Sequence, residues 1–298
     1  MAHFRKFTDL RNTSNTIFYI LVLPKTIQVF KKILCVFLFF LSFNLLSQET
    51  EISLVSWNIR DFGKTKNNDE LEKIAEIVRE ADILAIQEVV AGYGGAQAVA
   101  KLSDILNRKG SKWDYVISKP TNSSKYVTER YAFVWKTKHI KIKNRGRLLT
   151  ELDSVVDREP FLLEFYIGKS KLGILNFHSR PYNKNPQSEV QEISKFIVSS
   201  LETPLVFTGD FNMNEEDEAF SELLNKGFSP TILNQKTTLK TQCKGFAYLN
   251  HVIDNMYFSK DIEKVDGGVI DFVRVCDRVE QARKLSDHLP VFLMFSFK

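Results

Sequence analysis

Cysteine is scarce in this sequence, which has three in 298 residues. Cys243 and Cys276 do not stand in a metal-ligand spacing, which argues against a cysteine-based metal site. Cys35 lies inside an apolar run and lacks the small-residue context of a lipoprotein site. The other two could pair in an oxidising compartment, but two free thiols fit the sequence equally well, so the pairing stays open here.

A hydrophobic run of membrane-spanning length is also missing. The apolar stretch 33–46 has 14 residues, whereas a transmembrane helix needs about 20. Lys31 and Lys32 precede it and Ser47 follows it, which is typical of a secretory signal peptide. We therefore expect residues 1–47 to be a signal peptide and residues 48–298 a secreted or periplasmic domain, with an uncleaved anchor as the alternative. A true start near Val29 would explain the unusually long stretch before the basic pair.

An excess of one charge disappears once this leader is set aside. The whole chain holds 41 basic and 36 acidic residues. Residues 1–47 contain six of the basic and one of the acidic residues, which leaves 35 of each. The mature domain therefore has no general attraction for nucleic acid, and any such binding must come from local patches.

Repeats, low-complexity tracts and proline- or serine-rich linkers are absent from residues 50–298, which predicts one domain. Strand-like runs occur at residues 52–57, 83–87, 131–135, 161–167, 172–177, 205–208, 252–258 and 291–297. Helical patterns occur after Asp69, as an expected N-cap, and at 96–106, 189–198 and 216–224. Strands with a few helices indicate an α/β or α+β sandwich, and periodicity does not choose between them.

Polar residues gather at the ends of these apolar runs. The set is Asn58, Glu88, Glu129, His178, Asp210, Asn212, Asp254, Asp287 and His288. Each alone has an ordinary explanation, such as turn chemistry for an aspartate or a structural role for a histidine. Functional sites are often built where loops leave strand ends, so we expect the whole set to converge at one edge of the sandwich.

This combination of residues suits phosphodiester hydrolysis. That reaction needs an attacking water, a protonated leaving group and stabilisation of charge on the phosphoryl oxygens. Carboxylate and amide oxygens suit Mg²⁺ or Mn²⁺. Histidine transfers protons near neutral pH, and a carboxylate beside each ring fixes its tautomer.

The same residues lie in motifs that resemble the endonuclease/exonuclease/phosphatase superfamily, and most closely its deoxyribonuclease I branch. The superfamily-level motifs are Gly209-Asp210-Phe211-Asn212 and Ser286-Asp287-His288-Leu289-Pro290. Those that narrow the match are Ser56-Trp57-Asn58-Ile59-Arg60-Asp61-Phe62-Gly63, Ile86-Gln87-Glu88-Val89, Glu129-Arg130-Tyr131, Arg158-Glu159-Pro160 and Phe177-His178-Ser179. They run in order across roughly the whole mature chain.

The resemblance implies a four-layer sandwich, in which two mainly antiparallel sheets pack together between helices. It also implies a role for each residue of the set. Asn58 and Glu88 would hold Mg²⁺ or Mn²⁺, with Asp287 nearby. His178 and His288 would be the acid–base pair, oriented by Glu129 and Asp254. Asp210 and Asn212 would position the metal, the phosphate or the water.

Two arginines, Arg60 and Arg158, would contact DNA phosphates, since the planar guanidinium grips two oxygens at once. For Arg158 the alternative is a surface ion pair with Glu159 or another acid. The implied activity is that of a monomeric DNA endonuclease that leaves 5′-phosphate ends and needs no stable protein partner. Added structural support from Ca²⁺ stays open.

Some positions depart from that branch. Val90 stands where the branch has an arginine that enters the minor groove, Val127 stands where it has a tyrosine that stacks on the sugar, and His251 replaces a cysteine. A related phosphodiesterase or phosphatase that acts on a lipid or inositol head group is therefore the alternative enzyme. A non-catalytic binding module is a third reading, against which stands the presence of His178, Asp254 and His288 together.

Overall fold

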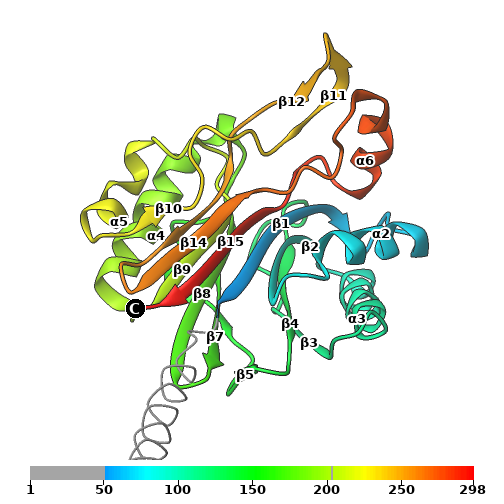
Figure 1. Cartoon of the computed structure of the whole chain (residues 1–298). Coiled ribbons are helices and arrows are strands. Elements are labelled where there is room, and N and C mark those ends of the chain that lie inside the picture. Colours follow the sequence, from blue (N-terminus) through cyan, green and yellow to red (C-terminus); the bar gives the residue numbers. More distant parts are fainter. Residues whose placement is uncertain (1–50, 203) are drawn as a thin grey trace, which may run out of the picture. The chain divides into compact units, whose positions relative to one another are not determined.

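The computed structural model describes residues 51–202 and 204–298, and the predicted signal peptide lies outside the described residues. Two β-sheets pack face to face with helices outside them (Figure 1). The first sheet runs β14 (Ile262–Val269), β15 (Val291–Phe297), β1 (Ile52–Phe62), β2 (Ile83–Val90), β4 (Glu129–Lys136), β3 (Trp113–Ile117). The second runs β10 (Ser229–Pro230), β13 (Asp254–Phe258), β9 (Leu205–Asp210), β8 (Ser170–His178), β7 (Phe161–Ile167), β5 (Ile140–Ile142), with β6 (Arg147–Leu148) beside β7.

Most strand pairs are antiparallel, and the pairs β1–β2 and β8–β9 are parallel. The helices are α2 (Asn68–Val78), α3 (Tyr93–Asn107), α4 (Pro186–Ser200), α5 (Ser221–Asn225) and α6 (Val279–Leu285). No helix in the described part of the chain combines the length and apolar character needed to cross a membrane.

Alternate residues of the central strands face two different cores. Leu54 and Ile83 belong to the core between the sheets, whereas Val55 and Leu84 pack under the helices of the first sheet. Successive side chains point to opposite faces of a strand, so a strand covered on both faces reads as a continuous apolar run. A third core, which includes Phe207, lies between the second sheet and its helices. The three cores confirm the expected four-layer sandwich.

The structure corrects two of the predicted helices. The N-cap of α2 is Asn67 rather than Asp69: its side chain accepts from the Glu70 amide, and the Glu70 carboxylate accepts from the Asn67 amide. Asp69 instead lies in the first turn, where a negative charge also stabilises a helix. The helix expected at 216–224 is a 3₁₀ turn, Glu218–Phe220, followed by the short α5.

A two-stranded hairpin, β11 (Leu239–Lys244) and β12 (Ala247–Leu249), stands out from the body of the molecule (Figure 1). Periodicity did not predict it. A disulfide joins Cys243 in β11 to Cys276 in the turn before α6, with the two Cα atoms 5.6 Å apart. The pairing that the sequence left open is therefore present in the structure.

Candidate active site

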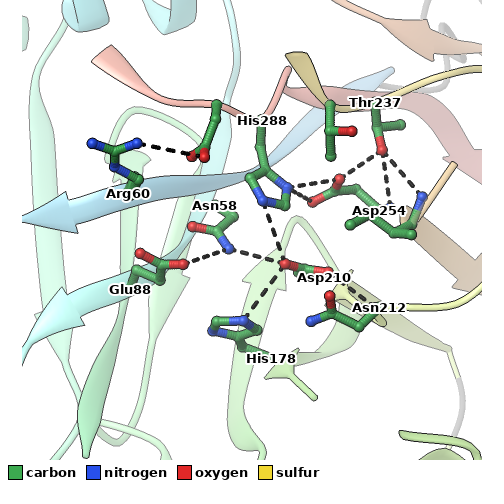
Figure 2. Close-up of polar contacts among 12 residues, drawn as sticks. Asn58, Arg60, Glu88, His178, Asp210, Asn212, Thr237, Asp254 and His288 are labelled. Atoms are coloured by element: carbon green, nitrogen blue, oxygen red, sulfur yellow. Dashed lines mark hydrogen bonds and ion pairs between the residues drawn. The ribbon is translucent and has the colours of Figure 1, made fainter. Parts of the chain in front are cut away.

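Strands of both sheets carry the predicted set to one edge of the sandwich. In the second sheet, His178 ends β8 and Asp210 ends β9, and the two residues are register partners in the parallel pair. Asp254 begins β13 and is the antiparallel register partner of Asp210. In the first sheet, Asn58 in β1 is the register neighbour of Gln87, which precedes Glu88 in β2. The pairing thus brings together residues up to 230 positions apart, with His288 just before β15 (Figure 2).

Asn58 and Glu88 form the first-sheet side of the site. The buried Asn58 amide nitrogen donates to Glu88 Oε1 at 3.1 Å and to Asp210 Oδ2 at 3.0 Å. The Asp61 backbone amide donates to Glu88 Oε2 at 3.1 Å. Glu88 itself has a positive φ of 59°, a conformation that is uncommon outside glycine and often found at functional sites.

His178 belongs to a buried group of three charged or titratable side chains. Its Nδ1 lies 3.0 Å from Glu129 Oε2, and the same oxygen lies 3.2 Å from Arg158 Nε. Burial lowers the pKa of His178, but the Glu129 and Asp210 carboxylates outweigh burial and raise the pKa above its ordinary value, although Arg158 opposes them. Glu129 holds the ring at Nδ1. The other ring nitrogen, Nε2, faces Asp210 inside the site (Figure 2).

His288 has a partner of the same kind. Its Nδ1 lies 3.0 and 3.1 Å from the two oxygens of Asp254. The Thr237 hydroxyl donates to Asp254 Oδ2 at 2.6 Å and accepts from the Asp254 backbone amide. Burial lowers the pKa of His288, but Asp254 and Asp210 outweigh it and raise that pKa to about 10. Burial also raises the pKa of Asp254 above its ordinary range.

Asp210 lies between the two imidazoles. Its Oδ2 is 3.5 Å from His178 Nε2 and 3.7 Å from His288 Nε2, and it also accepts from Asn58 (Figure 2). The Asn212 backbone amide donates to the other oxygen at 3.0 Å, and Asn212 has a positive φ of 50°. Both rings therefore direct their free nitrogen to one small space, which is what a pair of proton-transfer groups acting on one phosphate requires.

The remaining predicted residues lie at the rim or behind it. Arg60 is exposed, and its Nη1 lies 3.5 Å from Asp287 Oδ2, which also contacts Arg283 at 3.4 Å. Arg158 is 6 % exposed, and its Nη1 donates to the Ser179 backbone carbonyl at 2.9 Å. The surface ion pair with Glu159 weighed for Arg158 is not what the structure shows, since its carboxylate partner is Glu129 inside the protein.

Two contacts in the site were not foreseen from the sequence. Thr237 lies in no motif, and it reaches Asp254 because the segment before β11 pairs with the residues around His288. Ser286 donates to the Asn58 backbone carbonyl at 2.6 Å and accepts from the His288 amide, which ties the two sides of the site together. Ser286 was part of a quoted motif, but its type gave no sign of this contact.

The Asn58–Glu88 side fits a hard divalent cation. Asn58 Oδ1 is buried and has no hydrogen-bond partner among the described residues. An unpaired buried carbonyl oxygen costs free energy unless something binds it, and the nitrogen of the same amide contacts the Glu88 carboxylate. Asp210, Asp254 and His288 form a second cluster whose ligand atoms lie within 4.8 Å of one another. Asp210 is close to both groups.

Comparisons with known proteins agree with one another. The model of the Endonuclease/Exonuclease/phosphatase family matches residues 41–288. Deoxyribonuclease gamma of Mus musculus is 26% identical over 262 residues, which is 80% of this chain and 83% of that protein. Deoxyribonuclease-1 of Mus musculus is 28% identical over 183 residues, which is 57% of this chain and 63% of that protein.

Solved structures resemble the fold. An endonuclease/exonuclease/phosphatase family protein from Bacteroides thetaiotaomicron superposes with a TM-score of 0.58 at 16% identity, covering 84% of this chain and 99% of the other. At that identity the likeness concerns the arrangement of sheets and helices alone.

Proposed function

The chain belongs to the endonuclease/exonuclease/phosphatase family and is a phosphodiester hydrolase, and we propose that it is a secreted DNA endonuclease that depends on a divalent metal and leaves 5′-phosphate ends. The proposal includes a signal peptide at residues 1–47 and a mature domain from residue 48, released or periplasmic. The observation that carries it is the pair of carboxylate-backed imidazoles whose Nε2 atoms lie 3.5 and 3.7 Å from one Asp210 oxygen.

The named relatives that match over most of this chain are deoxyribonucleases, which supports DNA as the substrate. Arg60 supports it further, because it is an exposed guanidinium at the rim, able to grip a phosphate. For Arg158 a direct phosphate contact stays a prediction. Its observed contacts give it a positioning role, since it holds the Glu129 carboxylate that orients His178.

In the proposed reaction, one imidazole removes a proton from the attacking water and the other gives a proton to the departing O3′ of the DNA. The water oxygen then bonds to phosphorus as the bond to O3′ breaks, which leaves the phosphate on the 5′ side. Asp210 and Asn212 would hold the water or the phosphate between the two rings. General acid and base groups contribute about 10²–10⁴-fold each to such rates.

Asn58 and Glu88 are the residues that would hold Mg²⁺ or Mn²⁺, with Asp287 near them. When bound, the ion would supply positive charge against the phosphoryl oxygens. The unpaired Asn58 Oδ1 supports this role, since a metal ligand needs a free lone pair. The Asp287 carboxylate contacts both Arg60 and Arg283, so it would bind the ion only after Arg60 turned towards a phosphate.

The direct test is nicking of supercoiled plasmid by the purified mature chain with Mg²⁺, with Mn²⁺ and with EDTA. We expect nicked circles with either metal and none with EDTA, and ligatable 5′-phosphate ends. A parallel assay with sphingomyelin and an inositol phosphate tests the alternative substrate class. Hydrolysis of those compounds without plasmid nicking would contradict the proposal.

A further inference from the structure

We propose that the β11–β12 hairpin is a second DNA-binding element, which holds the phosphate backbone of the duplex several nucleotides from the bond that is cut. This inference rests on the proposed function, because it extends the candidate active site outward along the same substrate. Nothing in the proposed hydrolysis itself uses the hairpin.

The base of the hairpin is continuous with the active site. The Leu239 amide donates to the Asp287 carbonyl at 2.8 Å, and the Leu289 amide donates to the Thr237 carbonyl at 2.7 Å. These bonds flank a bridge between Thr238 and His288. A cavity of about 550 Å³ lies between the base of the hairpin and the active site, and its lining includes His288 together with Lys240 and Lys244. A DNA strand that runs from His288 along this cavity therefore meets the hairpin.

The hairpin carries positive charge, although the domain as a whole has no net charge. Between residues 239 and 249 the charged residues are Lys240 and Lys244, with no acid. Neither lysine forms an ion pair within the described part of the chain. The cavity lining adds Arg283 and the single carboxylate Asp287. Because the mature domain is near neutral, phosphate binding has to come from local positive patches, and the hairpin lysines form such a patch.

The hairpin is held in place on one side. The disulfide to Cys276 fixes β11, and the Tyr248 hydroxyl donates to Asp271. Arg283 donates to the Leu239 carbonyl at 2.8 Å, while Leu239 itself is buried in a small apolar cluster. An arm fixed before binding loses little conformational entropy on contact, so its lysines can act at a defined distance from the cut.

The length of the arm sets that distance. The six residues of β11 extend about 20 Å at roughly 3.3 Å per residue. Since each nucleotide of a duplex strand advances about 3.4 Å, the tip would reach about six base pairs from its base. We therefore expect the contribution of Lys244 to depend on the length of the substrate.

The tip also exposes one large apolar side chain, Phe246, which is 94% exposed and has a φ of 65°. One aromatic residue offers little apolar area for entering a bilayer, whereas the two lysines line a cavity shared with His288. The structure therefore favours DNA over a lipid surface as the partner of the hairpin, and membrane binding becomes an outcome of the test.

The test compares the double variant Lys240→Gln/Lys244→Gln with the matched control Lys141→Gln/Lys169→Gln. The control removes the same charge from exposed lysines at the β5 and β7–β8 end of the second sheet. Each mature protein is assayed on bis(4-nitrophenyl) phosphate, on duplexes of about 6 and 20 base pairs, and at several salt concentrations. The wild-type protein with its disulfide reduced is assayed in the same way and compared with the oxidised wild type.

For the hairpin variant we expect KM on the long duplex to rise about five- to tenfold with kcat little changed, and the salt dependence of binding to weaken by about one unit of log–log slope per lysine. Hydrolysis of the small phosphodiester should not change, and the control should behave as wild type. Equal KM and slope in variant and control would overturn the proposal. So would binding of the wild type to anionic vesicles that is lost in Phe246→Ala, if DNA affinity is unaffected by the lysine changes. Failure of the wild type to nick plasmid would instead contradict the proposed function.

Discussion

The two imidazole–carboxylate pairs of the candidate site look alike but differ in what stands behind the carboxylate. Behind His178, Glu129 faces the Arg158 guanidinium at 3.2 Å. Behind His288, Asp254 faces the neutral Thr237 hydroxyl at 2.6 Å. The arginine opposes the two carboxylates that raise the pKa of His178 above its ordinary value, while the pKa of His288, which has no such cation behind its partner, rises to about 10.

From this difference we infer, as a hypothesis, which ring carries out which proton transfer. A ring that keeps its proton at neutral pH is suited to protonate the leaving oxygen, which favours His288 as the general acid. A ring whose basicity is restrained by a nearby cation is more easily found neutral, which favours His178 as the general base.

Removal of either ring should have the largest effect. We expect His178→Ala and His288→Ala each to lower the rate of plasmid nicking by about 10²–10⁴-fold. The two variants should separate on bis(4-nitrophenyl) phosphate, whose nitrophenolate leaves without protonation. His288→Ala should be far less impaired there, whereas His178→Ala should be impaired on both substrates. Equal losses on both substrates for both variants would remove the assignment, and circular dichroism would confirm that each variant is folded.

The next effect concerns the carboxylate behind the acid. In Asp254→Asn the charge that raises the pKa of His288 is lost, and burial then lowers that pKa. The ring should lose its proton as pH rises past a lower value, so the alkaline limb of the rate profile should move down by one or more pH units. We expect about a 10- to 100-fold loss at pH 8 that shrinks towards pH 6, measured as kcat/KM across the pH range. An alkaline limb that stays in place would contradict the role given to His288.

A change to Arg158 should act in the opposite direction on the other ring. In Arg158→Met the cation that opposes protonation of His178 is gone, so the pKa of His178 rises and the acidic limb moves upward. The rate at pH 7 should fall by about tenfold and recover at higher pH. Arg158→Lys keeps the charge and should keep the limb near its place. Because removing one partner of a buried ion pair costs about 3–5 kcal/mol, thermal melts must accompany the profiles.

The sequence predicts some parts of this structure and not others. The strands with continuous apolar runs were predicted, since each run of strand length records burial on two faces. β14 was missed because it carries Lys264, Asp266 and two glycines in place of such a run. The convergence of the strand-end residues was expected because functional sites are often built where loops leave strand ends.

What stands behind each carboxylate could not be predicted. Arg158 is 29 positions from Glu129, and the alternatives for it were a DNA phosphate or a surface acid. Thr237 is 17 positions from Asp254 and belongs to no motif. Whether an arginine turns inward, or which hydroxyl meets a carboxylate, depends on the packing of distant segments and leaves no periodic signal.

The smallest expected effect comes from the hydroxyl behind Asp254. In Thr237→Val the Asp254 carboxylate loses a donor, and the Ile253 and Asp254 amides lose an acceptor. A buried carboxylate that loses a hydrogen bond is harder to ionise, so it should hold the proton of His288 less firmly and move the alkaline limb slightly down. The rate near neutral pH should fall only a few-fold, while unfilled hydrogen bonds should cost about 1–3 kcal/mol of stability. Thr237→Ser keeps the hydroxyl and should restore both measurements. If Thr237→Val instead matched Asp254→Asn in its pH profile, the hydroxyl rather than the charge would govern His288, and the contrast between the two pairs would have to be drawn differently.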